Sequence, residues 1–275
     1  MDISKITTGL RKGELGIWFS EDRAQINYPD DGNKLCFEIE KNSFWFEHRN
    51  KCITTIIEQY HPPGTVFDVG GGNGIVASAI QNMGIDVVLV EPGMTGAINS
   101  KQNGVQSVIC STIQDAGFLN NSIPAMGLFD VLEHIESDQD FLVSINRLLI
   151  PGGKLYLTVP AFRILWSTED NYAEHFRRYS TTELIQKLSS SGFNYIYSTY
   201  IFSFLVLPIL LIRTIPSRLG FRRTISKNQE MNEHRPPTGI LGGLFDQFSS
   251  FEIKLLWKKK SIPFGGSCLI VVEKI

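Results

Sequence analysis

Apolar and polar positions along this chain follow two alternating patterns. Short, nearly continuous apolar runs are typical of strands buried on both faces of a sheet, and between them apolar residues recur at helical spacing. The predicted strands cover residues 65–69, 87–90, 105–109, 125–129, 154–159, 195–200 and 267–273. The predicted helices cover residues 43–60, 75–80, 93–103, 138–149 and 181–190. This alternation predicts an α/β fold with a largely parallel sheet.

The most distinctive stretch follows the first predicted strand. The apolar run ends near Asp68, four glycines occur among residues 70–74, and a helical pattern begins at Ile75. Glycine has no Cβ atom, so it adopts positive φ at little cost and lets a ligand approach the main chain. A tight turn with nothing bound is the simpler interpretation, but such turns usually need one glycine or asparagine. The stretch therefore predicts a ligand-binding loop.

Two kinds of ligand fit this loop. Residues 72–77 read G-N-G-I-V-A, which matches the dinucleotide fingerprint, and Glu91 follows about twenty residues later. Against an NAD-dependent oxidoreductase, Gly70 and Gly71 precede the fingerprint, and the carboxylate of Asp68 would repel a pyrophosphate. S-adenosylmethionine carries an amino group and no phosphate, so Asp68 would attract it. We favour this ligand and keep the oxidoreductase as an alternative.

Residues 66–74 (V-F-D-V-G-G-G-N-G) resemble the first motif of the class I S-adenosylmethionine-dependent methyltransferases. The resemblance extends to V-V-L-V-E at 87–91, D-V-L-E-H at 130–134, and P-G-G with an apolar strand at 151–159. The loop 160–180 contains L-W-S-x-x-D and H-x-R-R-Y and is similar to a bacterial branch of that family. The resemblance implies a doubly wound, Rossmann-like, seven-stranded and mostly parallel sheet, whose antiparallel last strand lies beside the sixth.

The same resemblance implies S-adenosyl-L-methionine as methyl donor and S-adenosyl-L-homocysteine as product. Glu91 is implied to accept hydrogen bonds from both ribose hydroxyls, a task that suits a carboxylate because its two oxygens can take two O–H donors. At the adenine loop many relatives carry an acid, where this chain has Thr112 and Ile113. The implied cofactor-binding residues are Asp68, Gly70, Gly72, Glu91, Thr112, Ile113 and Asp130.

Candidate catalytic residues lie after the fourth and fifth predicted strands, whose carboxyl ends border the ligand site in this fold. His175 is the first candidate for a base that deprotonates the acceptor, since an unperturbed imidazole titrates close to working pH. Asp170 is positioned in sequence to orient it, and His134 and Tyr179 are the next candidates. Methyl transfer depends mainly on in-line placement, so a base is not strictly required.

The loop 160–180 also carries Arg177 and Arg178, which suit an anionic acceptor. The competing interpretation makes the loop a structural clasp, with Trp166 as an anchor and both arginines tied to nearby acids. A subset of relatives, including small-RNA 2′-O-methyltransferases and some ubiquinone-pathway O-methyltransferases, has E-x-x-E-H in the fourth motif and holds a divalent metal there. In this chain the first glutamate is replaced by the shorter Asp130. A divalent metal at Asp130, Glu133 and His134 is therefore the less favoured alternative.

The chain divides into an N-terminal extension and cap helix (1–60), a methyltransferase core (61–200), an insert (201–262) and the final core strand (263–275). The cap contains Phe44, Trp45, Phe46 and Arg49, which close the cofactor site in one interpretation. In the other interpretation the three aromatic residues belong to the core and Arg49 is a surface charge. The insert joins an apolar run, 201–212, to a basic stretch that reaches Lys227. We rank it first as a lid over an acceptor pocket, then as a membrane-surface element at 201–227 for a lipid-linked substrate, or as a homodimer interface.

Composition narrows the partners. The chain has 275 residues, 43% of them hydrophobic, a formal charge of −2 and a pI near 6.2, which give no general attraction to nucleic acid. Its four cysteines have no metal or disulfide spacing, and we expect a cytoplasmic protein, peripheral to the membrane at most. The sequence thus predicts methyl transfer to an oxygen or nitrogen of a small-molecule or lipid-linked acceptor. The alternatives are the NAD-dependent oxidoreductase and a non-catalytic cofactor-binding scaffold.

Overall fold

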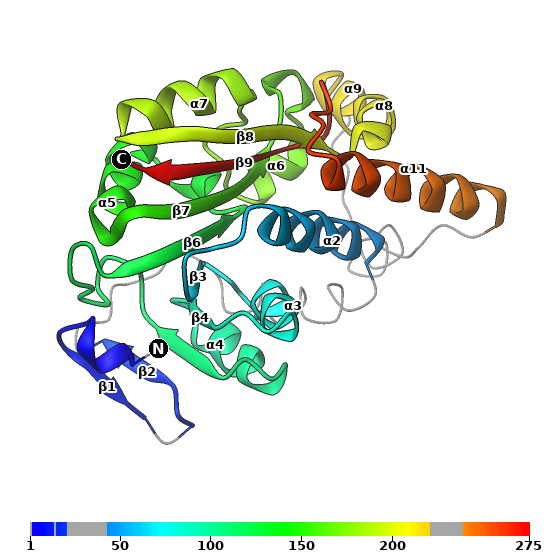
Figure 1. The fold of residues 1–275 in the computed structure, drawn as a ribbon. Coiled ribbons are helices and arrows are strands. Elements are labelled where there is room, and N and C mark those ends of the chain that lie inside the picture. Colours follow the sequence, from blue (N-terminus) through cyan, green and yellow to red (C-terminus); the bar gives the residue numbers. More distant parts are fainter. Residues whose placement is uncertain (1, 14, 21–42, 221–238) are drawn as a thin grey trace.

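The computed structural model describes residues 2–13, 15–20, 43–220 and 239–275, without the side chains of residues 240 and 241. Residues 30–33 (D-D-G-N), whose composition predicts a turn, and the basic residues Arg222, Arg223 and Lys227 lie outside this part of the chain. Within it, one large sheet lies between two layers of helices (Figure 1).

The sheet has the strand order β1-β2-β5-β4-β3-β6-β7-β9-β8. The strands are β1 (Leu10–Lys12), β2 (Trp18–Ser20), β3 (Val66–Val69), β4 (Val87–Val90), β5 (Ser107–Cys110), β6 (Ile123–Phe129), β7 (Leu149–Pro160), β8 (Phe193–Ile201) and β9 (Ser267–Lys274). Strands β3 to β7 pair in parallel, and β9 inserts antiparallel between β7 and β8. The predicted fold class is confirmed, and β2 extends the predicted seven strands by pairing with β5 and carrying β1.

Helices cover both faces of the sheet. They are α2 (Phe44–Gln59), α3 (Ile75–Asn82), α4 (Met94–Gln102), α5 (Asp138–Leu148), α6 (Thr168–Tyr172), α7 (Thr181–Ser190), α8 (Val206–Pro208), α9 (Ile215–Arg218) and α11 (Gly239–Trp257). Short 3-10 segments are η1 (Ile3–Lys5), η2 (Leu132–His134), η3 (Arg163–Leu165) and η4 (Ser203–Leu205), and η5 (Ile209–Thr214) is a π-helix. The sequence offers Asn42 or Ser43 as the cap of α2 and Ser180 or Thr181 as the cap of α7. In the structure the side-chain oxygens of Ser43 and Ser180 cap these helices.

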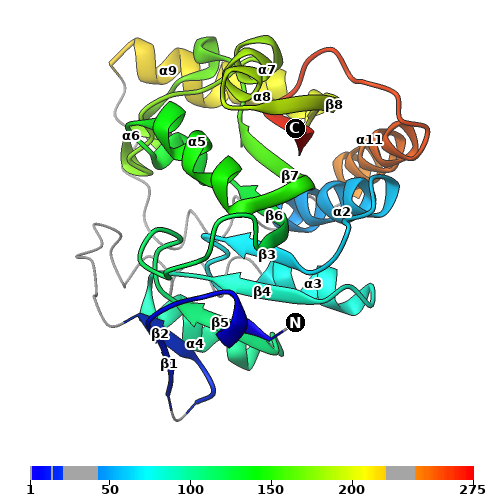
Figure 2. The same ribbon diagram turned by 60° about the vertical axis from the view of Figure 1, so that its left-hand side comes forward.

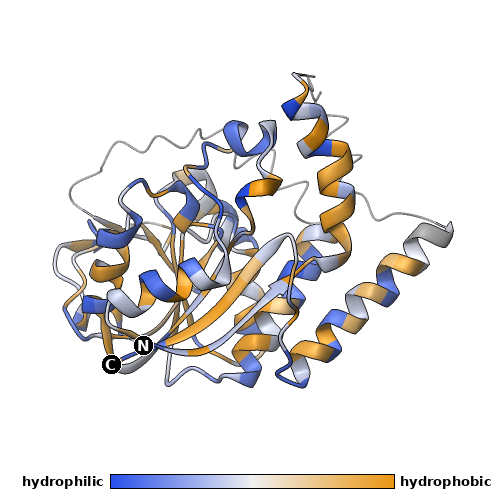
Figure 3. Cartoon of the chain, turned by 90° about the horizontal axis from the view of Figure 1, so that it is seen from above, coloured by the Kyte–Doolittle hydropathy of each residue, from blue (hydrophilic) through white to orange (hydrophobic). Residues whose placement is uncertain are grey.

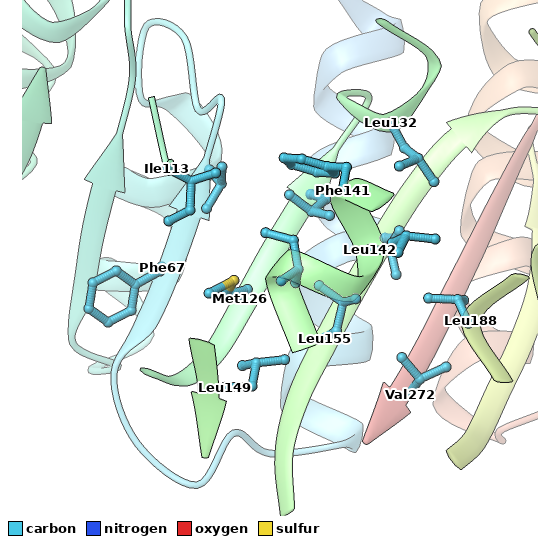
Figure 4. Packing of buried hydrophobic residues seen from close by; sticks show 14 of the residues in the cluster. Phe67, Ile113, Met126, Leu132, Phe141, Leu142, Leu149, Leu155, Leu188 and Val272 are labelled. Carbon is cyan, nitrogen blue, oxygen red and sulfur yellow. The ribbon is translucent and has the colours of Figure 1, made fainter. Parts of the chain in front are cut away.

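Two buried clusters join these layers to the sheet. One packs α5 and α7 against one face, with Phe141, Leu142 and Leu188 prominent (Figure 4). The other packs α2, α3, α4 and the end of α11 against the opposite face. Figure 2 shows the two helical layers on opposite sides of the strands. The strand ends are thereby held rigidly, which lets the loops beyond them form a site.

The predicted start of the fifth strand at residue 154 is wrong. The residues P-G-G at 151–153 have the chemistry of a helix stop, with glycine able to adopt the left-handed region. Helix α5 instead ends at Leu148, and β7 begins immediately at Leu149, which pairs with Ile123 of β6. Gly152 has φ +73°, but it lies inside β7. Pairing across the sheet therefore decided this boundary, not the local helix-stop chemistry.

The insert joins β8 to β9 through η4, α8, η5, α9 and α11, and α11 lies beside α2 (Figures 1 and 2). The buried Glu252 of α11 accepts hydrogen bonds from the backbone N–H of Phe202 (2.9 Å) and Ser203 (2.6 Å) and pairs with His48 Nε2 of α2 at 2.8 Å. These contacts fix the start of the insert against the core. Among the described helices none is both long and apolar enough to cross a membrane.

Candidate active site

The glycine loop joins β3 to α3 at the carboxyl edge of the sheet. Gly70 and Gly72 have φ of +70° and +53°, which favour glycine. A Cβ atom on Gly70 would lie 2.8 Å from Val131, whereas one on Gly72 would meet nothing within 4 Å. Gly70 is therefore required by packing, and Gly72 borders open space in which a ligand has room to approach the backbone.

Asp68 lies beneath this loop and is only 1% exposed. Burial raises its pKa to about 7, an effect that the charge of Arg49 opposes and the charge of Glu91 reinforces. The Oδ2 atom is buried without a hydrogen-bond partner among the described residues. Such an atom usually has a partner in a folded protein. A ligand with a positively charged amino group would supply one, as the sequence argument for S-adenosylmethionine requires.

Glu91 lies at the end of β4, next to the glycine loop. Its Oε2 accepts a hydrogen bond from the backbone N–H of Gly72 at 2.9 Å, and its Oε1 accepts one from Gly93 at 2.7 Å. Each carboxylate oxygen has a second lone pair, so both can still accept a ribose hydroxyl. The two contacts hold Glu91 in place beside Gly72, where the resemblance predicts the ribose.

The predicted adenine loop follows β5. Thr112 is half-buried, and its hydroxyl donates to Asp115 at 2.7 Å. Ile113 is 4% exposed and its side chain belongs to the core cluster shown in Figure 4. The side chain of Ile113 is therefore used for packing, which leaves its main chain as the part that can meet a nucleobase.

Asp130 directly follows β6 and has φ +58°, a conformation that costs energy for a residue other than glycine. It is held there by Arg49, whose Nε lies 2.6 Å from Asp130 Oδ2, and by the hydroxyl of Thr158, which donates to Oδ1 at 3.1 Å. Arg49 also donates from Nη2 to the carbonyl of Phe129 at 2.9 Å. The cap helix therefore contacts the predicted cofactor site, and Arg49 is not a surface charge.

A cavity of about 570 Å³ opens beside Asp130. Asp130 is the one predicted cofactor-binding residue that lines it. Its other lining residues are Phe44, Trp45, Phe46, Glu133, His134, Pro160, Glu169, Asp170, Ala173, His175, Arg178, Phe202, Leu205, Pro208, Ile209, Ile212, Arg213, Gly266 and Ser267. No residue of the glycine loop lines the cavity, but Gly70 packs against Val131, the residue that follows Asp130.

Two predicted catalytic histidines meet in this cavity. The rings of His134 and His175 are 4.8 Å apart between centroids and nearly perpendicular. His175 Nδ1 lies 3.0 Å from Asp170 Oδ1, so the carboxylate orients the imidazole as predicted and leaves Nε2 as the other ring nitrogen. Burial, with a further effect from His175, lowers the pKa of His134 to about 4, so His134 is neutral near pH 7.

Glu133 completes this cluster. Its side chain is fully buried and neither carboxyl oxygen has a hydrogen-bond partner in the described part of the chain. Burial, reinforced by the charge of Asp130, raises the pKa of Glu133 well above its usual range. One ligand atom from each of Glu133, His134 and His175 lies within 4.8 Å of the others. The predicted metal set of Asp130, Glu133 and His134 is not the one brought together, because Asp130 is paired with Arg49.

Tyr179 and Arg177 do not reach the cavity. Tyr179 is 2% exposed, and its hydroxyl donates to Asp138 Oδ2 at 2.9 Å, so it is engaged in packing rather than in positioning an acceptor. Arg177 pairs with the same Asp138 at 2.8 Å. Arg178 lines the cavity but donates to Asp170 and to the carbonyl of Ala161. For Tyr179 and both arginines, the clasp interpretation agrees with the contacts.

Three further lining residues were not predicted from the sequence: Glu169, Gly266 and Ser267. The signal for the last two was the dipeptide Gly265-Gly266 just before β9, since a Cβ on Gly265 would lie 2.2 Å from the carbonyl oxygen of Ile201. That close approach brings the start of β9 against the end of β8. No local pattern distinguished Glu169 from other acids in the loop.

The chain matches the family model of the methyltransferase domain over residues 44–198, more than half of its length. It is 26% identical over 99 residues to a ubiquinone biosynthesis O-methyltransferase of Xanthomonas oryzae, a match that covers 34% of this chain and 41% of that relative. The chain thus spans about two fifths or less of the length of the curated relatives that it matches.

Two solved structures have the same fold. One is phosphoethanolamine N-methyltransferase 2 of Haemonchus contortus in complex with S-adenosyl-L-methionine, with TM-score 0.56, 15% identity and coverage of 91% of this chain and 58% of that one. The other is a possible histamine N-methyltransferase of Thermotoga maritima, with TM-score 0.55, 17% identity and coverage of 88% and 98%. With the family match, the fold and the glycine loop, they lead to one conclusion: this chain belongs to the class I S-adenosylmethionine-dependent methyltransferases.

Proposed function

We propose that this protein transfers the sulfonium methyl group of S-adenosylmethionine to an oxygen or nitrogen of a small-molecule or lipid-linked acceptor. The observation that carries the proposal is the position of Asp130, which lines the 570 Å³ cavity and directly follows β6, the strand paired with β3 that leads into the glycine loop. A donor held by the glycine loop and an acceptor in the cavity would therefore meet near Asp130. Among the relatives, the names of the two N-methyltransferases and the O-methyltransferase describe acceptors of this general kind.

The donor site uses three carboxylates in different ways. Asp68, whose Oδ2 has no hydrogen-bond partner among the described residues, is assigned to the amino group, and Glu91, held by the N–H of Gly72, is assigned to the ribose hydroxyls. Asp130, already neutralised by Arg49, lines the wall shared with the acceptor. When bound, the cofactor supplies an electrophilic methyl carbon on a sulfonium, and it leaves as the neutral thioether S-adenosylhomocysteine.

His175 is the residue that we assign to the acceptor proton. The acceptor atom uses its lone pair to bond to the methyl carbon, and the proton that it loses passes to Nε2 of His175. Asp170 stabilises the resulting imidazolium through the 3.0 Å contact to Nδ1. His134, neutral near pH 7, is placed to hydrogen-bond the acceptor next to His175.

We also place the chain in the bacterial branch with L-W-S-x-x-D and H-x-R-R-Y. The supporting contacts converge on Asp170, which accepts from His175 Nδ1, from Arg178 Nε at 2.7 Å and from the backbone N–H of Ser167 at 2.9 Å. The two motifs are thus halves of one buried cluster. Their shared role in this chain is to hold His175 at the cavity.

The test uses radiolabelled cofactor and a crude extract from the source organism as the supply of acceptors. Wild-type protein should yield a labelled product that is lost in a His175→Ala variant whose S-adenosylhomocysteine affinity is unchanged. Calorimetry with S-adenosylhomocysteine and with NAD separates the oxidoreductase alternative, since only the first should bind. Binding without any labelled product would favour the non-catalytic scaffold.

A second role for the histidine cluster is to hold a divalent cation. In its favour, the ligand atoms of Glu133, His134 and His175 lie within 4.8 Å of one another, and Asp170 orients His175 from behind, as an outer carboxylate does at many metal sites. A metal there would polarise the acceptor oxygen and favour its deprotonation. Treatment with EDTA, followed by addition of Mg²⁺, Mn²⁺ or Zn²⁺, decides between the roles. Activity that survives EDTA supports His175 as the base.

A further inference from the structure

The lining of the cavity differs in chemistry from element to element. Its polar side comes from η2 and from the loop around α6, and it carries Glu133, His134, Asp170 and His175. Its apolar side comes from two other places, the first turn of α2 and the insert from Phe202 to Ile212. Figure 3 shows apolar stretches along the helical segments of the insert. Polar and apolar lining residues therefore come from different elements, with Arg213, the neighbour of Ile212, as the charged lining residue of the insert.

We propose that the acceptor is an amphiphile, with a protic head at His134 and His175 and a hydrocarbon segment against the apolar side. This inference deepens the proposed function and rests on it. The hydrocarbon segment would run from Trp45 and Phe202 along Ile209 to Ile212. The head supplies the O–H or N–H group that is methylated.

The apolar side is preformed. The rings of Trp45 and Phe202 are stacked, with centroids 5.2 Å apart and planes within 2°. Phe202 has φ +61°, an unfavourable conformation for a bulky residue, and Glu252 holds it through the backbone N–H. The fold therefore holds a strained residue at the place where it completes this apolar surface.

Size and exposure point to the same occupant. A cavity of 570 Å³ is in the range that accommodates a whole drug-sized ligand, so a small polar amine or alcohol would leave the apolar side wet. The apolar surface also continues outward, because Ile212 lines the cavity while remaining 56% exposed. A chain that extends past Ile212 would cover this surface and gain from each methylene buried.

The neighbouring residues provide a matched control. Leu211 is 54% exposed, almost the same as Ile212, but it does not line the cavity. Replacing either by asparagine removes a similar exposed apolar side chain from the same helix. Ile212→Asn should weaken the binding of a ligand inside the cavity, and Leu211→Asn should not. Ile209→Asn, a second variant of a lining residue, should weaken it as well.

The experiment is a calorimetric titration with hexan-1-ol, octan-1-ol and decan-1-ol, performed on the free protein and on protein saturated with S-adenosylhomocysteine. We expect affinity to rise about tenfold for every two methylenes. Ile212→Asn and Ile209→Asn should weaken decan-1-ol binding about tenfold, while Leu211→Asn binds as wild type does. All three variants should retain wild-type affinity for S-adenosylhomocysteine, which reports an intact core.

Two results would overturn the inference: alkanols that fail to bind or bind without chain-length dependence, and an equal loss in Leu211→Asn. The second would mean that the apolar residues act as an outer surface, as in contact with a lipid bilayer, and not as a cavity. Failure of the proposed function is distinct, because it appears as absent S-adenosylhomocysteine binding, or as absent labelled product, in the wild type. The titrations on free protein then still report on the cavity.

Discussion

Arg49 of α2 forms an ion pair with Asp130 at the end of β6, with 2.6 Å between Nε and Oδ2. The guanidinium is 5.5 Å from the ring of Trp45 and 5.9 Å from that of Phe46. One cation thus joins the cap helix, two aromatic rings that line the 570 Å³ cavity and the residue that follows β6. It also opposes the burial that raises the pKa of Asp68.

Replacing Arg49 by glutamine should therefore destabilise the fold and weaken cofactor binding together. Loss of the guanidinium leaves the carboxylate of Asp130 without its partner charge. We expect the free energy of unfolding to fall by about 2–3 kcal/mol, less than for a fully buried pair because the Asp130 side chain is 21% exposed. Urea unfolding at pH 7 measures this change. Lys51→Gln is the control, since Lys51 pairs with Glu47 on the surface of the same helix and should change stability by less than about 0.5 kcal/mol. Equal stability of the two variants would contradict the assignment.

Asp68 should make the cofactor-free protein less stable as pH rises. Its folded pKa, about 7, lies above its ordinary value of 3.8, so the folded state holds a proton that the unfolded state releases. The stabilisation is complete below about pH 4 and is lost as pH rises through 7. Asp68→Asn should remove this dependence. The unfolding free energy of the variant relative to that of the wild type should therefore rise by on the order of a few kcal/mol from pH 5 to pH 8. Denaturant unfolding at the two pH values, with the exposed Asp140→Asn as control, tests it.

Cofactor affinity should change with pH in the direction opposite to stability, and it should also depend on Asp68. Deprotonated Asp68 attracts the amino group, so the affinity of the wild type for S-adenosylhomocysteine should increase from pH 6 to pH 8. In Asp68→Asn this increase should disappear while binding is weaker throughout. Calorimetry at three pH values provides the measurement, and a wild-type affinity that stays constant over this range would remove Asp68 from direct recognition.

Glu91→Ala should weaken S-adenosylhomocysteine binding about a hundredfold, because two hydrogen bonds to a charged acceptor are lost. The substitution also frees the backbone N–H groups of Gly72 and Gly93. Isothermal titration reports the affinity, with Glu58→Ala on the exposed side of α2 as the matched control. Unchanged affinity in Glu91→Ala would exclude the ribose role.

Asp170→Asn should slow methyl transfer about tenfold to a hundredfold without changing cofactor affinity. The carboxylate orients the imidazole of His175 through the 3.0 Å contact to Nδ1, so its removal should slow proton transfer from the acceptor. Glu174→Gln, in the same loop but exposed, should leave the rate unchanged. The comparison requires the acceptor found with the labelled cofactor. Equal rates in Asp170→Asn and Glu174→Gln would mean that Asp170 does not position His175 for the reaction.

Much of the molecule could be predicted from the chain alone because the signals are local. The switch from apolar runs to helical spacing predicted the alternating elements, and capping residues at 42–43 and 180–181 marked two helix starts to within one position. The four glycines after Asp68 and the acid at Glu91 predicted two neighbouring strand ends of a cofactor site. Each of these signals involves residues within a few positions of one another, so neighbouring residues suffice to specify them.

Tertiary structure alone decided the rest, since strand order and insertion bring distant residues together. Arg49 meets Asp130 across 81 positions only because α2 packs over the end of β6, and Phe202 meets Trp45 only because Glu252 anchors the insert. Tyr179 was predicted at the acceptor, yet α5 presents Asp138 to its hydroxyl and draws it into the core. The sequence by itself therefore determined the fold class and the glycine loop, whereas the shape and polarity of the cavity follow from long-range packing that no local pattern encodes.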